Sequence, residues 1–284
     1  MDAPIIRIDA FGDPACPWDF SSEPYRLRLL WRYGAHLEIT HRMIGLSSSP
    51  DDYAARGITT ADIAAGRDMI RGRYGMPLHS GEAPRHVATV VACRAVVGAR
   101  LHDPDGAARL LRRLRILGLS EGMLIDEPET IARAAEEAGL SAKDVAAWAQ
   151  EDATAEALAI DMAEARSPAP PALAMPERLA RTPEGGWRYT APSYAISCGD
   201  VRLDSPGFQP ARVYEVLVAN VAPHVAPRPG PQGVGEVLEW APYPLATAEV
   251  AGIMELPVDT ARRLLAEAGA TAHPSAGDAY WSAG

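Results

Sequence analysis

The sequence DPACPWD at residues 13–19 lies between an alternating apolar run and the beginning of a helical pattern. The alternation over residues 6–10 places apolar side chains on one face of a strand. Pro17 suits the first position of a helix, because its missing amide would have no helical partner there. Cys16 is therefore expected at the N-terminus of a helix, where the helix dipole favours the thiolate form. We expect any chemistry of this chain to centre on Cys16.

A second alternating run, at residues 37–43, follows a helical pattern that covers residues 17–33 and ends at Gly34. Two strands joined by one helix form a βαβ unit, in which the strands are expected to be parallel and the crossover right-handed. The pattern from about residue 60 to residue 166 is helical. It ends at the proline-rich segment 167–171, which is typical of a stiff linker.

The pattern returns to strands after this linker. Residues 187–197 predict one strand interrupted by Ala191-Pro192, and Gly199-Asp200 is a suitable hairpin turn into residues 201–203. A helix over residues 213–221 follows. The order βαβ, helical block, ββα predicts an α/β protein with a thioredoxin fold and a large all-helical insertion.

These patterns predict three structural units and one linker. The last unit contains helices, a turn and a terminal strand pair, which is the outline of a small winged-helix-like module. The predicted units are a thioredoxin-like domain at 1–60 and 185–222, a helical insertion at 61–184, a linker at 223–235 and the winged-helix-like module at 236–284.

The motif at residues 13–19 resembles the active site of the DsbA-like branch of the thioredoxin superfamily. That branch includes the FrnE-type oxidoreductases and the 2-hydroxychromene-2-carboxylate isomerases, and its active-site run is Asp-Pro-x-Cys-Pro-Trp-Cys. This chain differs from the run only at its last position, where Asp19 stands in place of the second cysteine. The resemblance covers roughly residues 4–222 and leaves the C-terminal unit outside it.

The resemblance implies roles for several residues. Cys16 would be the nucleophilic cysteine, and Pro192 would follow a cis peptide bond that faces it. A cis bond there would turn neighbouring backbone groups outward, so that they can pair with a bound thiol. Pro17 and Trp18, together with Ala191 and Pro192, are therefore expected to bind the thiol co-substrate.

Asp19 removes the resolving thiol on which dithiol oxidases and isomerases depend. Cys93, among apolar neighbours, is expected to be a small core residue, and Cys198 is expected far from Cys16 at a hairpin end. The remaining chemistry is that of a monothiol oxidoreductase, or of a thiol-dependent transferase or isomerase, in which a low-molecular-weight thiol resolves the adduct on Cys16. By resemblance that thiol is glutathione, or mycothiol in some bacteria. The alternative is a catalytically silent thioredoxin-like module kept for binding or regulation.

Asp19 itself has two possible roles. It follows Cys16 by three residues, so on a helix its carboxylate can approach the sulfur and raise the thiol pKa, or act as a general acid when protonated. The alternative is that Asp19 only caps the first helical turn, by accepting hydrogen bonds from backbone amides. We predict that the electrostatic coupling operates and suppresses disulfide exchange at Cys16.

The composition argues against several classes of protein. The net charge is −10, and residues 228–284 carry three arginines against seven acids, so a nucleic-acid or anionic membrane surface is not expected. No apolar run approaches a membrane span or a signal peptide, which predicts a cytoplasmic protein with free cysteines. No spacing typical of metal ligands occurs. We expect a small thiol or an electrophilic substrate as the partner, and no tightly bound cofactor.

Overall fold

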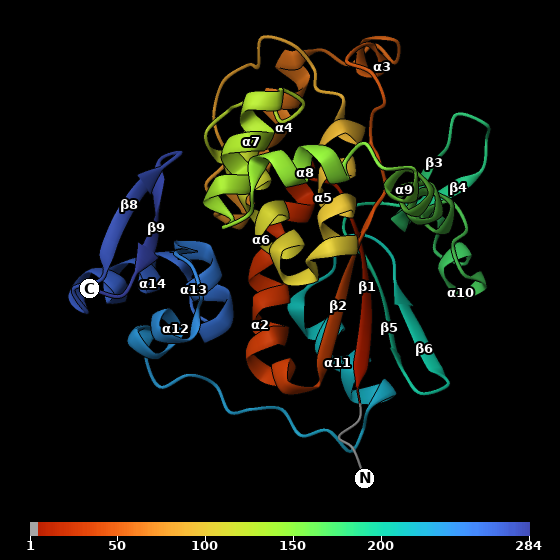
Figure 1. Cartoon of the computed structure of the whole chain (residues 1–284). Coiled ribbons are helices and arrows are strands. Elements are labelled where there is room, and N and C mark those ends of the chain that lie inside the picture. The colour runs from red at the N-terminus through yellow and green to blue at the C-terminus, as the bar shows by residue number, and fades with distance from the viewer. Residues whose placement is uncertain (1–4) are drawn as a thin grey trace.

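The computed structural model describes residues 5–284, and its centre is a four-stranded mixed sheet of order β2-β1-β5-β6. Strands β1 and β2 are parallel, with Ile8 beside Ile39, and β5 is antiparallel to β1, with Ile196 beside Ile8. Figure 1 shows the strands running side by side through the middle of the molecule. The strands are β1 (Ile6–Gly12), β2 (Leu37–Met43), β5 (Ser193–Cys198) and β6 (Val201–Ser205).

Two helical segments connect the parallel strands: α1 (Pro17–Ser21) and α2 (Glu23–Tyr33). The sequence predicted one helix here, but Pro24 has no amide hydrogen to bond the carbonyl of Phe20, so the helix breaks at Ser22. Helix α11 (Ala211–Val221) packs with α2 against the sheet in one apolar core. The βαβ unit and the closing ββα unit that the alternating patterns predicted are therefore present.

The helical insertion lies between β2 and β5 and packs an apolar core of its own around α5 and α6. The first turn of α5 meets the chain after β2, where the amide of Val90 donates to the carbonyl of Ser47 at 3.0 Å, and α9 packs against β2. The elements are α3 (Asp51–Ala54), α4 (Thr60–Tyr74), α5 (Thr89–His102), α6 (Pro104–Arg115), the π-helical turn η2 (Ile116–Ser120), α7 (Pro128–Glu137), α8 (Ala142–Trp148), α9 (Asp152–Ala165), α10 (Pro170–Leu173) and the 3₁₀ turn η3 (Pro176–Arg178).

The insertion is not entirely helical. Strand β3 (Leu179–Arg181) pairs with β4 (Trp187–Tyr189) in a separate two-stranded sheet. The sequence predicted residues 187–197 as one interrupted strand, but the interruption ends β4, and β5 begins afresh in the central sheet. Pro192 cannot donate a ladder hydrogen bond, which favours a break between the two strands at this point.

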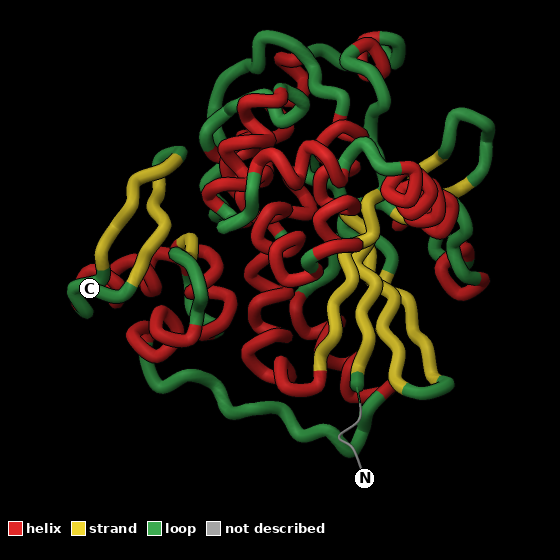
Figure 2. The backbone as a smooth tube through the Cα atoms, in the orientation of Figure 1, coloured by secondary structure: helices red, strands yellow, loops and turns green. Residues whose placement is uncertain are grey.

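The C-terminal residues form a compact module beside α2. Its three-stranded sheet has the order β7-β9-β8, and Figure 2 shows the extended loop that leads to it from α11. The elements are α12 (Val234–Trp240), β7 (Leu245–Ala246), α13 (Thr247–Met254), α14 (Val258–Glu267), β8 (Thr271–Ser275) and β9 (Asp278–Ser282). The predicted helix pair and terminal strand pair are present, and the winged-helix likeness of the module stays a prediction. In residues 5–284 no helix is long and apolar enough to cross a membrane.

The module packs against α2 through a close approach at Gly252 of α13. A Cβ atom at Gly252 would lie 2.6 Å from the Cβ of Pro24 and 3.2 Å from the Pro24 carbonyl oxygen, so any larger residue would force the two helices apart. We therefore predict that Gly252→Ala lowers the free energy of unfolding by about 1–3 kcal/mol, as overpacking does. Chemical denaturation measures the change.

Gly72→Ala is the matched control, because Gly72 lies within α4 and a Cβ atom added there would meet no atom within 4 Å. There the added methyl group should stabilise the protein by about 0.5–1 kcal/mol, the helix-propensity difference between the two residues. Equal effects of the two substitutions would show that the contact between α13 and α2 is unimportant.

Candidate active site

Cys16 lies at the N-terminal end of α1, as predicted. Its backbone carbonyl accepts from the amide of Phe20 at 3.0 Å, and its own amide donates to the carbonyl of Asp13 at 3.1 Å. The Ala191–Pro192 peptide bond is cis, the geometry that the resemblance implied. The Sγ of Cys16 donates to the carbonyl oxygen of Ala191 at 3.4 Å, so the two segments meet at the sulfur. Only 6% of Cys16 is exposed.

Asp13 fixes the loop that presents Cys16. This fully buried carboxylate accepts from the amide of Ala15 at 2.9 Å and from the amide of Leu46 at 2.9 Å. It also accepts from the hydroxyl of Thr89 at 2.8 Å and from the Sγ of Cys93 at 3.7 Å. Asp13 thus connects the Cys16 loop to the chain after β2 and to the first turn of α5. Burial raises the pKa of Asp13, and these hydrogen bonds act in the opposite direction.

Asp19 is buried behind Cys16 in an ion cluster. Its Oδ2 accepts from the amide of Asp13 at 3.1 Å and forms an ion pair with Arg115, which also pairs with Glu23. Gly12 permits this arrangement, because the space of a Cβ atom at Gly12 is occupied by the Asp19 carboxylate. Asp19 is therefore not a cap of α1, since the amide that it accepts from lies before that helix.

The charges and the burial of this site act on the thiol. Burial raises the pKa of Cys16 to about 12, with further contributions in the same direction from Asp19 and then Asp13. The amides of Asp19 and Trp18 oppose the shift but do not outweigh it. The helix N-terminus, which was expected to favour the thiolate, does not outweigh the desolvation of the sulfur, and Asp19 acts in the direction that the sequence predicted by raising the thiol pKa.

The carboxylates behind Cys16 are held by arginines. Burial raises the pKa of Asp19, and Arg115 and Arg26 act against it. Burial also acts to raise the pKa of Glu23, but Arg26 and Arg115 outweigh it and lower this pKa to about 2. The ion pair with Arg115 requires the carboxylate form of Asp19, so negative charge is placed close to the sulfur.

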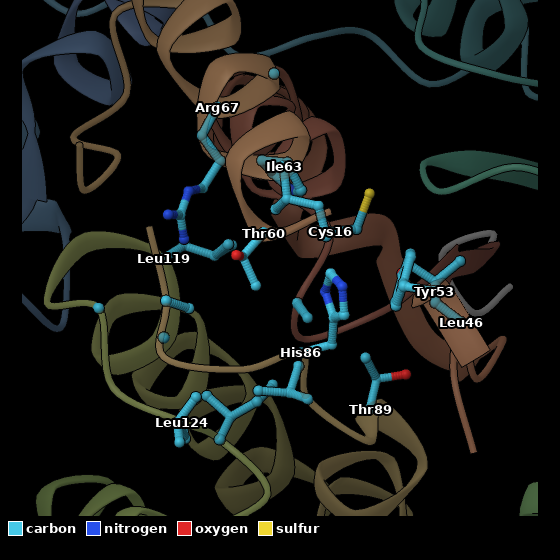
Figure 3. Close-up of a pocket in the computed structure, with 18 of the residues that line it drawn as sticks. Cys16, Leu46, Tyr53, Thr60, Ile63, Arg67, His86, Thr89, Leu119 and Leu124 are labelled. Carbon is cyan, nitrogen blue, oxygen red and sulfur yellow. The ribbon is translucent and has the colours of Figure 1, made fainter. Parts of the chain in front are cut away.

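Cys16 borders a cavity of about 320 Å³ between the first helix and the helical insertion. Pro17 and Trp18 line it on the side of Cys16, and Figure 3 shows Ile63 and Arg67 entering from α4 and His86 from the chain before α5. Most of the lining is apolar. The apolar lining residues include Leu46, Ile63, Ile70, Val87, Leu119 and Leu124.

The predicted site residues therefore divide into three groups. Cys16, Pro17 and Trp18 share the cavity wall, whereas Ala191 reaches the sulfur through its carbonyl and is followed by Pro192, which is buried. Asp19 does not line the cavity, and its carboxylate lies in the ion cluster with Arg115.

Sequence reasoning missed the residues that the helical insertion brings to the site. Tyr53, Arg67 and His86 line the cavity, and Arg115 holds Asp19. No local motif surrounds them. Their separation from Cys16 along the chain left no sequence signal.

Comparisons with known proteins identify the fold of this chain. Neither a protein-family model nor a curated protein sequence matches the chain. A solved structure of a proposed protein disulfide isomerase from Nitrosomonas europaea matches with a TM-score of 0.59 and 16% identity, over 79% of this chain and all of that one. The chain has the DsbA-like thioredoxin fold. The order of its central sheet and the helical insertion confirm the predicted α/β class.

Two further DsbA-like structures agree with this fold. A proposed DsbA oxidoreductase from Streptomyces coelicolor matches with a TM-score of 0.56 and 18% identity, over 79% of this chain and 93% of that one. The cytosolic disulfide reductase DsbM of Pseudomonas aeruginosa matches with a TM-score of 0.50 and 18% identity, over 70% of this chain and 88% of that one. At these identities the likeness concerns the fold.

In this DsbA-like fold, Asp19 offers a direct test of the electrostatics at the sulfur. Asp19→Asn removes a negative charge beside Cys16 and leaves part of the Arg115 charge uncompensated, so the pKa of Cys16 should fall. We predict that alkylation of Cys16 by iodoacetamide near neutral pH becomes about tenfold faster, the effect of about one pKa unit. Peptide-level mass spectrometry over a series of pH values measures this rate.

Glu23→Gln is the control, because it removes an equal charge from the same ion cluster while Glu23 makes no leading contribution to the thiol pKa. It should change the rate much less than Asp19→Asn. Thermal unfolding of both variants checks that each is folded. An unchanged alkylation–pH profile in Asp19→Asn would show that Asp19 has a purely structural role.

Proposed function

We propose that this chain is a thiol-disulfide oxidoreductase of the DsbA-like type that works with the single thiol of Cys16. Its finer description is a monothiol enzyme, FrnE-like in kind, that uses a low-molecular-weight thiol such as glutathione or mycothiol. The observation that carries the proposal is the position of the Cys16 sulfur, which lies at a helix N-terminus, contacts the carbonyl of Ala191 and borders a cavity. A transferase or isomerase that uses the same thiol would have the same site.

The other cysteines support single-thiol chemistry. Cys93 is fully buried in the core of the insertion and its thiol donates to Asp13. Cys198 ends strand β5, whose first residue, Ser193, follows the cis-proline. The five-residue separation along the strand corresponds to about 16 Å, too far for a disulfide with Cys16. All three cysteines are free.

The proposed reaction is a thiol–disulfide exchange with two half-reactions. Cys16 loses its proton to solvent, and the thiolate attacks one sulfur of a disulfide, forming a mixed disulfide and releasing the other sulfur as a thiolate. The thiolate of a small thiol then attacks the substrate sulfur of the mixed disulfide, which releases the Cys16 thiolate and forms a disulfide between the small thiol and that part of the substrate. A second small thiol exchanges with this disulfide, so that in total one substrate disulfide is reduced to two thiols and two small thiols are oxidised to their disulfide.

A reducing compartment suits this chemistry, because small thiols are abundant there. DsbM, which shares the fold, is described as a cytosolic disulfide reductase. We accordingly propose that the chain acts in the cytoplasm, with a small-molecule thiol or an electrophilic substrate as its partner.

Incubation with glutathione disulfide tests the proposal. We predict a glutathione adduct on Cys16 that reduced glutathione removes, and none on the same peptide in Cys16→Ser. Because the pKa of Cys16 is raised to about 12, the thiolate fraction and the rate should increase about tenfold per pH unit between pH 7 and pH 10. Mass spectrometry of the adduct against time gives the rate.

The second candidate function is a catalytically silent thioredoxin-like module, and one observation favours it. The Cys16 thiol is buried and its pKa is raised, so an attacking thiolate is scarce at neutral pH. The absence of an adduct at every pH, in both the native chain and Asp19→Asn, would favour this candidate over the enzyme.

Asp19→Cys tests whether the absence of a second thiol is what prevents dithiol chemistry at Cys16. The variant restores the two-cysteine motif, and we predict a disulfide between residues 16 and 19 and a new ability to reduce insulin. Because the substitution leaves Arg115 paired with Glu23 alone, Asp19→Cys should also be prepared together with Arg115→Met. Asp19→Ser is the control that removes the carboxylate without adding a thiol. Peptide mapping that finds no disulfide at these positions in either background would contradict the prediction.

A further inference from the structure

The cavity beside Cys16 is positively charged in a chain whose net charge is −10. Among the described residues that line it there is no Asp or Glu, whereas Arg67, Arg85 and His86 are present. The charge of Arg85 is compensated, because it forms ion pairs with Asp126 and Glu127 outside the lining. Arg67 therefore supplies the uncompensated positive charge of the cavity.

Arg67 is buried without a carboxylate partner. It is 6% exposed, and no acid in residues 5–284 lies within ion-pair distance of its guanidinium. Its Nη2 donates to the carbonyl oxygen of Gly81, and its Nε is buried with no hydrogen-bond partner. Burial lowers the pKa of Arg67, with only Asp68 acting against it. A buried, unpaired charge is unfavourable for folding, so its presence in a cavity wall points to a ligand.

We propose that Arg67 binds the carboxylate of a compact molecule that occupies the cavity beside Cys16. Arginine presents donors in a planar fork that matches a carboxylate. Ile63, Leu119 and Leu124 supply apolar surface for the rest of the ligand. Figure 3 shows the Arg67 side chain extending from its helix into the group of cavity residues. This inference rests on the proposed function, because it assigns the cavity to the substrate or co-substrate of Cys16.

The size and the other polar groups of the cavity narrow the class of ligand. A volume of about 320 Å³ is at the lower end for small-molecule sites, so it suits a compact acid of one or two rings or a tripeptide such as glutathione, and not a longer polypeptide. His86 packs against Tyr53 with ring centroids 5.3 Å apart, and its buried Nδ1 has no partner in the described residues. A second polar atom of the ligand can bond there.

The carboxylate has two possible sources. It can belong to the low-molecular-weight thiol, since glutathione carries carboxylates whereas mycothiol carries none. It can also belong to a separate, apolar substrate that reacts with the thiol. The chemistry at Arg67 is the same in both cases, so the two sources are distinguished by the choice of probe.

Isothermal titration calorimetry on the full-length Cys16→Ser protein tests the inference without any reaction at the thiol. The probes are 2-naphthoate, its neutral amide 2-naphthamide, and reduced glutathione. We expect 2-naphthoate or glutathione to bind, and its dissociation constant to rise at least tenfold in Arg67→Gln. Arg67→Lys should retain part of the affinity, because it keeps the charge but not the fork. Arg73→Gln removes an exposed charge from the same helix and should change nothing.

The outcomes distinguish the two sources of the carboxylate from each other and from a failure of the inference. Binding of 2-naphthoate that depends on Arg67 assigns the carboxylate to a separate substrate, and such binding of glutathione alone assigns it to the thiol. If Arg67→Gln weakens 2-naphthamide as much as 2-naphthoate, or weakens neither anionic probe, the inference is wrong. Because Cys16 is absent from this experiment, its result is independent of whether the thiol exchanges disulfides.

Thermal unfolding of the ligand-free protein gives a second measurement. A buried charge whose partner is a ligand destabilises the ligand-free protein. Arg67→Met should therefore leave the melting temperature unchanged or raise it. A large fall in the melting temperature would indicate that the bond from Arg67 to Gly81 is structural, and would overturn the assignment of Arg67 to a ligand.

Discussion

The structure around Cys16 depends on one buried ion cluster, in which Arg115 joins Asp19 of α1 to Glu23 at the beginning of α2. Arg26 completes the cluster through a second contact to Glu23. A buried carboxylate is tolerated only with such partners, because removal of one partner leaves an uncompensated charge in a region of low dielectric. Arg115 ends α6, so this cluster also fastens the helical insertion to the helix that carries the cysteine.

The cluster gives a physical meaning to the departure from the two-cysteine motif. Asp19 replaces a thiol and, in addition, forms ionic contacts that a thiol cannot make. Its charge acts on Cys16 together with burial, so the thiol is held protonated where the helix alone would favour the thiolate. A buried, protonated thiol reacts slowly in the ligand-free protein. A ligand that places positive charge or hydrogen-bond donors at the sulfur would lower the thiol pKa and increase the reactivity of Cys16.

The helical insertion contributes as much to the site as the thioredoxin-like part does. The cavity wall opposite Cys16 comes mainly from α4, which carries the unpaired Arg67, from the chain before α5, and from residues 118–125. The C-terminal module supports the same region from behind, since Tyr280 and Ala248 share an apolar cluster with Phe20 of α1 and Ile70 of α4. Cysteine, cavity and module are therefore parts of one packed unit, and changes in the module can reach the helix that carries Cys16 through direct contacts.

Strands β1, β2 and β6, the position of Cys16 at a helix N-terminus and the interruption at Ala191–Pro192 were predictable from the residue pattern, because alternation, helical spacing and proline act locally. The local patterns did not reveal the division of the first helix at Ser22, the pairing of β3 with β4, or the dominant effect of burial on the pKa of Cys16. Burial depends on packing between distant segments, which no local pattern records, whereas the contribution of Asp19 was predictable from its spacing. Tertiary structure also brought Arg115 to Asp19 and placed Arg67 in the cavity wall without an ion-pair partner in residues 5–284, since α6 and α4, which carry these arginines, lie far from Cys16 along the chain.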